Sequence, residues 1–169
     1  MTILPHLDIL LFEKRSFWMK NYKVILVGLD GSKNSVNAGQ RAIEMAAKLK
    51  AKLVLTTVLK PQINVAFGGV GLEPSNLNDG RLADEEKLAN ENLKKIYEQA
   101  KAAGVEDVEL KVKVGNPKVE LAKELPAQYQ ADLIIVGATG LNRVDRLIIG
   151  STAAYVVRNS GIDTLVVNE

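Results

Sequence analysis

Short apolar runs that alternate with helical segments constrain the fold of this chain more than any other feature. Residues 23–30, KVILVGLD, and residues 52–59, KLVLTTVL, are rich in β-branched residues and leucine over the length of one strand. Such uniformly apolar runs are typical of strands buried on both faces of a parallel sheet. Three further strands are predicted at residues 105–114, 132–136 and 164–167. Because parallel strands need crossover helices between them, this order predicts an α/β fold with a doubly wound, open, five-stranded parallel sheet.

Helical periodicity fills the intervals between the strands. The first helix is expected to start at Asn34 or Ser35, both good capping residues, and to bury a face that begins with Val36. The other helices are predicted over residues 81–103, from Asn116 and Pro117 until Pro126 disturbs the turn, and over residues 151–158.

The composition excludes several classes of site. The chain has 169 residues, no cysteine and one histidine, His6, which excludes a disulfide framework, thiolate catalysis and a cysteine zinc site and argues against a histidine triad. Its formal net charge is +2, too small to indicate nucleic acid as a partner. The function of this chain therefore has to depend on chemical groups other than thiols and imidazoles.

Residues 1–18 differ from the rest of the chain. Pro5, His6 and Asp8 interrupt their apolar patches, whereas a membrane span needs about 20 apolar residues, and they lack the pattern of a secretory signal. We therefore expect a cytoplasmic protein with no membrane partner and a single domain over residues 19–169. The extension is either an upstream start ahead of Met19 or an arm that docks on a partner subunit.

A glycine-rich segment carries the chemistry that we expect of this chain. Residues 137–140 are GATG, and after nine more residues the sequence GST at 150–152 opens the last helix. Glycines let a backbone approach a ligand closely, and a helix N-terminus with hydroxyl side chains suits phosphate. Arg143 and Arg146 could add contacts to the outer phosphates. The alternative is that these glycines only shape a turn and that Ser151 is an ordinary N-cap.

The segment VGATGLNRVDRLIIGST resembles the ATP-binding signature of the universal stress protein family, G-x2-G-x9-G-[ST]. The resemblance continues in VILVGLDGSKNS at the first strand and in DTLVV near the C-terminus. It covers about residues 20–169, which makes residues 19–169 a universal stress protein domain. It implies a Rossmann-like fold of the adenine nucleotide alpha hydrolase-like type, a homodimer, and ATP binding in the subset of members that carry this motif.

The resemblance also implies roles for individual residues. Asp30 would lie on the ribose side of the nucleotide or near its Mg²⁺ or Mn²⁺ ion, and the backbone of Val58 would meet the adenine. The residues implied to line the ribose and phosphates are Gly137, Gly140, Gly150, Ser151 and Thr152. From the residues alone, the alternatives are that Asp30 is only a turn former and that Val58 is simply a core residue.

Two positions depart from the pattern of the family. Gly28 stands where some ATP-binding members have proline, which leaves the backbone beside the adenine less constrained. Thr139 stands where histidine or arginine often occurs, which removes one phosphate contact.

Three functions follow from these observations as hypotheses. The first is a regulatory stress-response protein that binds ATP, or AMP or ADP, and presents a dimer surface to a protein partner. The second is an enzyme that hydrolyses ATP or adenylates slowly, with Asp30 or Asp145 orienting water. The third is an interaction module without nucleotide. In each case the apolar strand at 164–167 is expected at an edge of the sheet, where a second copy would pair with it.

Overall fold

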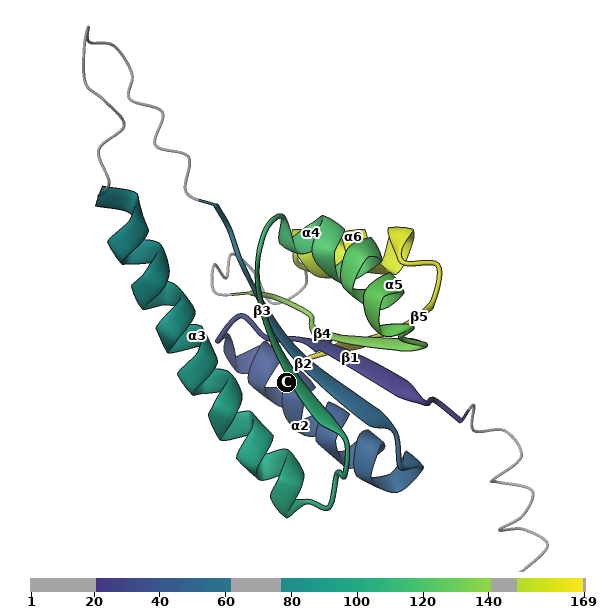
Figure 1. The fold of residues 1–169 in the computed structure, drawn as a ribbon. Helices are drawn as coiled ribbons and strands as arrows, with labels where there is room; N and C mark the ends of the chain where they lie inside the picture. Colours follow the sequence, from purple (N-terminus) through teal and green to yellow (C-terminus); the bar gives the residue numbers. More distant parts are fainter. Residues whose placement is uncertain (1–20, 62–76, 141–148, 169) are drawn as a thin grey trace, which may run out of the picture.

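In the part of the chain that the structure describes, one parallel sheet carries helices on both of its faces (Figure 1). The computed structural model describes residues 21–61, 77–140 and 149–168. The sheet order in this part of the chain is β3-β2-β1-β4-β5, with all neighbours parallel, so the predicted α/β class and sheet are confirmed. The strands are β1 (Val24–Gly28), β2 (Lys52–Leu59), β3 (Val108–Val114), β4 (Leu133–Gly137) and β5 (Asp163–Val167).

The helices divide between the two faces of the sheet. Helices α2 and α3 cover one face, and the short segments α4, η1 and α5 lie with α6 on the other (Figure 1). In the described residues no helix is both long and apolar enough to cross a membrane. The helical segments are α2 (Lys33–Leu49), α3 (Leu77–Ala102), α4 (Pro117–Val119), the π-helical turn η1 (Glu120–Glu124), α5 (Leu125–Tyr129) and α6 (Ser151–Asn159).

The hydrophobic core has two layers, one on each face of the sheet. Alternate residues of β1 show the division, because Ile25 and Val27 pack toward α2 while Leu26 packs toward α6 and η1. All three side chains are fully buried. Burial on both faces is why β1 is uniformly apolar and does not alternate with polar residues.

The start of α2 corrects the sequence prediction. Its N-cap is Ser32, whose side chain accepts a hydrogen bond from the Ser35 backbone N–H, whereas Asn34 and Ser35 lie buried in the first turn. Val36 is 42% exposed and therefore lies outside the core face. The rest of the expected face is correct, since Gly39, Ile43 and Ala46 are buried. The cap and Val36 were wrong, and the first turn of α2 packs on the end of β4, which local periodicity does not reveal.

Two other elements start three or more residues away from the predicted position. Helix α3 begins at Leu77, four residues before the expected start at Arg81. Strand β3 begins at Val108, because Val105 instead donates its backbone N–H to Ala100 O and ends the turn after α3.

The helical region after β3 confirms the predicted start and shows how it accommodates a proline. Asn116 caps α4 by accepting a hydrogen bond from the Lys118 N–H at 3.1 Å. Pro126 does disturb the helix, as expected, because it has no N–H to donate. The turn widens there, and Leu125 N–H reaches back five residues to Glu120 O. Helix α5 then continues to Tyr129.

Candidate functional site

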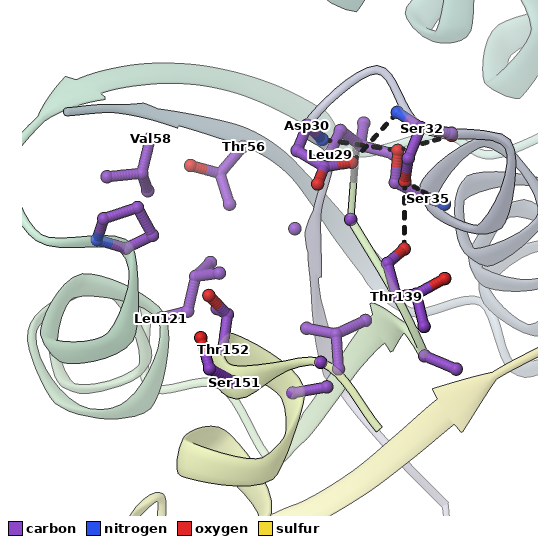
Figure 2. A pocket seen from close by; sticks show the side chains of 18 of the residues that line it. Leu29, Asp30, Ser32, Ser35, Thr56, Val58, Leu121, Thr139, Ser151 and Thr152 are labelled. Carbon is purple, nitrogen blue, oxygen red and sulfur yellow. Dashed lines mark hydrogen bonds between the residues drawn. The ribbon is translucent and has the colours of Figure 1, made fainter. Parts of the chain in front are cut away.

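A cavity of about 320 Å³ opens at the carboxyl edge of the sheet (Figure 2). Residues at and beyond the ends of β1, β2 and β4 form one side, and the N-termini of α4 and α6 form the other. This is the edge where open parallel sheets place their ligands. The volume falls in the range of small-molecule sites, which is about 300–1,000 Å³.

The cavity brings together the site residues that the sequence predicted and the structure describes. Arg143 lies outside the described residues, as do Asp145 and Arg146. The predicted residues that line the cavity are Asp30, Val58, Gly137, Gly140, Gly150, Ser151 and Thr152.

The N-terminus of α6 faces this cavity with its backbone donors available. Gly150 is the N-cap, and among the described residues no side chain caps the helix there. The hydrogen bonding of α6 begins with Ala154 N–H donating to Gly150 O at 2.9 Å, so the N–H groups of residues 151–153 precede it. Unpaired amides and the helix dipole together favour an anion at such an end.

Asp30 forms a turn and also lines the cavity. One carboxylate oxygen, Oδ1, accepts a hydrogen bond from the Ser32 N–H at 3.0 Å, and Gly31 has a φ of 82°, so the residue does form a turn. The other oxygen, Oδ2, points toward Gly140, because a Cβ added at Gly140 would lie 2.6 Å from it. Asp30 is also exposed and lines the cavity. Its second oxygen therefore lies beside the glycine loop after β4.

The motif glycines have different physical reasons to be glycine. A Cβ at Gly137 would lie 2.7 Å from the carbonyl carbon of Asn34 and 2.8 Å from the backbone nitrogen of Ser35. Gly137 thus allows α2 to pack on β4 whether or not a ligand is bound. Gly150 donates its N–H to Ala138 O at 2.7 Å, which ties the start of α6 to the loop after β4.

A sequence comparison decides the family. The profile of the Universal stress protein family matches residues 21–168. The chain belongs to the universal stress protein family. The predicted family and its Rossmann-like fold are therefore both confirmed.

Individual relatives are consistent with this membership. A universal stress protein from Staphylococcus saprophyticus is 34% identical over 150 residues, 88% of this chain and 85% of the relative. The solved structure of universal stress protein UspA from Lactobacillus plantarum has a TM-score of 0.76 at 25% identity, covering 89% of this chain and all of that one. Another solved universal stress protein, in complex with cAMP, has a TM-score of 0.66 at 35% identity, covering 88% and 99%.

Thr139, one of the two departures from the family pattern, holds the glycine loop in place. Its Oγ1 accepts a hydrogen bond from Asn34 Nδ2 at 2.7 Å. Its carbonyl accepts one from Ser32 Oγ at 3.3 Å (Figure 2). Both partners come from the start of α2. In this universal stress protein, the loop after β4 is therefore fixed by the loop after β1.

The second departure, Gly28, lies in a wall of the cavity that the sequence did not reveal. Leu121 of η1 packs over it, because a Cβ at Gly28 would lie 3.0 Å from Leu121 Cδ1. Pro117, Leu121 and the exposed Lys60 also line the cavity. No sequence motif marks these residues, because they come together only when the fold brings η1 opposite the ends of β1 and β2.

Thr56 is another lining residue that sequence reasoning missed. It is fully buried, and its Oγ1 has no hydrogen-bond partner among the residues that the structure describes. A signal was present, because Thr56 shares its face of β2 with Val58 two residues later.

Asp30 is the one acidic side chain among the described lining residues. Within the described ranges, no group of three or more histidine, cysteine, aspartate or glutamate residues is arranged to hold a metal ion. A divalent cation at this cavity would therefore take most of its ligands from elsewhere, as it does when it is bound through nucleotide phosphates.

Proposed function

We propose that this universal stress protein binds an adenine nucleotide, with ATP as the first candidate and AMP or ADP as alternatives, and acts as a dimeric regulatory protein in a stress response. One observation carries the proposal: seven of the predicted site residues, which lie between positions 30 and 152, line a single cavity together with the open N-terminus of α6. Neither histidine nor cysteine is needed to bind phosphate in such a site.

The lining residues suit the parts of a nucleotide. The backbone N–H groups at the start of α6, with the hydroxyls of Ser151 and Thr152, would hold the phosphates. Asp30 would hold the ribose or contribute to a Mg²⁺ or Mn²⁺ ion through Oδ2, which its turn leaves unused. The half-buried Val58 would present its backbone to the adenine. Gly140 would leave room for the ligand beside Asp30.

A homodimer through β5 is part of the proposal. Strand β5 is at the edge of the sheet, next to β4, and its Leu165, Val166 and Val167 are half-buried within one copy. An apolar edge strand favours pairing with another chain, and a second copy would pair with it about a two-fold axis. Sedimentation should give a dimer at micromolar concentration, and a monomer would contradict this part of the proposal.

Cyclic AMP is a second candidate ligand, because a solved relative 35% identical to this chain is described in complex with cAMP. A cyclic phosphate needs fewer phosphate contacts than a triphosphate does. The competing functions, slow ATP hydrolysis and an interaction module without nucleotide, have weaker support. Hydrolysis needs a group that orients water, and the one acidic side chain among the described lining residues, Asp30, is already proposed to hold the ribose or the metal ion.

Calorimetry with ATP and magnesium, and separately with cAMP, tests the proposal. We expect saturable binding of at least one of them by the full chain. Substituting Gly140→Leu should abolish it, because the new side chain would meet Asp30 Oδ2, while sedimentation still gives a dimer. Absence of heat and of a thermal shift at millimolar concentrations of both ligands would contradict the proposal. The cytoplasmic location stays a prediction from the sequence, to be tested by cell fractionation.

A further inference from the structure

The hydroxyl of Thr56 is a buried polar group that the protein does not satisfy. The side chain is 0% exposed, and Oγ1 has no hydrogen-bond partner among the described residues. The backbone carbonyl of Thr56, by contrast, is hydrogen-bonded, because it accepts the Leu29 N–H at 2.8 Å. Most buried hydroxyls in proteins are hydrogen-bonded, and an exception calls for an explanation.

The position of Thr56 makes the exception more informative. Val54, Thr56 and Val58 alternate along β2 and therefore point to the same face of the sheet, where Val54 and Val58 belong to the apolar layer beneath η1 and α6. Valine would fill the place of Thr56 with nearly the same shape. The fold therefore gives no packing reason for a hydroxyl at this point, and Thr56 lines the cavity described above.

The surroundings of Thr56 indicate which part of a ligand it would meet. The hydrogen bond from Leu29 places it beside the end of β1, next to Asp30, and Val58 follows it on the same face. Ser151 and Thr152 come from α6, on the other side of the cavity in Figure 2. Thr56 thus lies between the residues proposed to hold the base and the ribose, away from those proposed to hold the phosphates.

We propose that Thr56 Oγ1 hydrogen-bonds the nucleoside part of the bound nucleotide and contributes to recognition of the base and ribose. A threonine hydroxyl both donates and accepts, so it pairs with a ring nitrogen or amino group of a purine or with a ribose hydroxyl. This inference rests on the proposed function, because it assigns a role to one more residue of the same site.

The isosteric substitution Thr56→Val tests the inference, because it should move stability and affinity in opposite directions. Removing an unsatisfied hydroxyl should raise the unfolding midpoint of the unliganded protein. The same change should weaken binding of ATP, and of adenosine, by roughly tenfold. Thr56→Ser keeps the hydroxyl and should keep the affinity within about threefold of the wild type.

A matched control lies one residue further along β2. Thr57 faces the opposite side of the sheet, toward α2 and α3, so Thr57→Val should leave the affinity for adenosine unchanged. Comparison of adenosine with ATP locates the contact, because a nucleoside contact weakens both ligands by the same factor.

The outcomes separate this inference from the function on which it rests. If the wild type binds neither adenosine nor any adenine nucleotide, both fail. If the wild type binds and Thr56→Val binds equally well, the inference alone is overturned. A loss confined to ATP would move the contact to the phosphates and also overturn it. A lower unfolding midpoint for Thr56→Val would reveal a partner within the protein and overturn it as well.

Discussion

Helices α2 and α6 both begin at the carboxyl edge of the sheet, but only the N-terminus of α2 is capped by side chains of the described residues. At α2, Ser32 accepts the Ser35 N–H at 3.2 Å, and Ser35 Oγ in turn donates to Ser32 O at 2.9 Å. At α6 the N-cap is Gly150, without a side-chain cap among the described residues. The same chain thus closes one helix end with its own hydroxyls and leaves the other available for a ligand.

The contrast explains how a site can form without ionisable catalytic groups. A closed end such as that of α2 contributes stability, since a good N-cap is worth about 1 kcal/mol. An open end such as that of α6 forgoes this contribution and keeps its donors for an anion. The two ends are linked by Thr139, which binds Ser32 and Asn34 and belongs to the loop that leads toward α6. The capped N-terminus of α2 therefore holds the loop that precedes α6 in place.

The largest effect is expected from disturbing the closed end where it packs on β4. Gly137→Ala would place a Cβ 2.7 Å from backbone atoms of α2. We expect the free energy of unfolding to fall by about 3 kcal/mol, measured by urea denaturation. Gly80→Ala is the control, because a Cβ at this helical position meets nothing within 4 Å and should stabilise by about 0.5–1 kcal/mol. Equal stability of Gly137→Ala and wild type would mean that this packing is not tight.

Closing the open end should affect binding more than folding. Gly150→Asp gives α6 a capping carboxylate, which would occupy its N–H groups and repel phosphate. We expect the affinity for ATP to fall at least about tenfold, because charged hydrogen bonds are worth about 1.5–3 kcal/mol. Calorimetry measures the change, and Gly150→Ala controls for the Cβ, which would lie 3.2 Å from Ala138 O. An aspartate variant that binds ATP as well as the alanine variant does would remove α6 from the phosphate site.

Removing the cap of α2 should have a moderate effect, mainly on stability. Ser32→Ala loses the hydrogen bonds with Ser35 N–H and Thr139 O. We therefore expect the free energy of unfolding to fall by about 1 kcal/mol. Ser32→Thr retains the hydroxyl and should recover most of the loss. If both variants match the wild type in thermal unfolding, the α2 end is not closed in the way described here.

The smallest effect is expected at the first residue of α6. Ser151 is exposed and lines the cavity, so Ser151→Ala should change stability by less than about 0.5 kcal/mol. Its affinity for ATP should fall about threefold, since a single exposed hydroxyl contact is worth less than 1 kcal/mol. Binding of adenosine should not change. An equal loss for adenosine and ATP would place Ser151 near the nucleoside instead.

The strands of the sheet could be predicted from the sequence because their burial on both faces leaves a signal within each strand. Residues 23–30 and 52–59 are apolar throughout, and burial on both faces requires that pattern. The cap at Ser32 and the exposed Val36 were missed, because the packing of α2 on Gly137 joins residues about a hundred positions apart. Sequence periodicity does not register such contacts.

The candidate site was predictable to a similar degree. The motif glycines, Ser151 and Thr152 were found because a loop and a helix start form one continuous segment. Leu121 and Pro117 were missed, because only the fold brings η1 and α4 over the cavity. Thr56 could have been noticed as a polar residue between Val54 and Val58 on an inward face. Its unsatisfied hydroxyl, however, is visible only in three dimensions.

Backbone amide chemical shifts, recorded by NMR while ATP and magnesium are added to the full chain, test the central claim most directly. The account predicts that the amides of Ser151, Thr152 and Ala153 shift strongly and saturably. The amide of Ser35, which already donates to Ser32, should shift much less. Shifts of equal size at both helix ends, or no shift at α6 at millimolar ATP, would contradict the account.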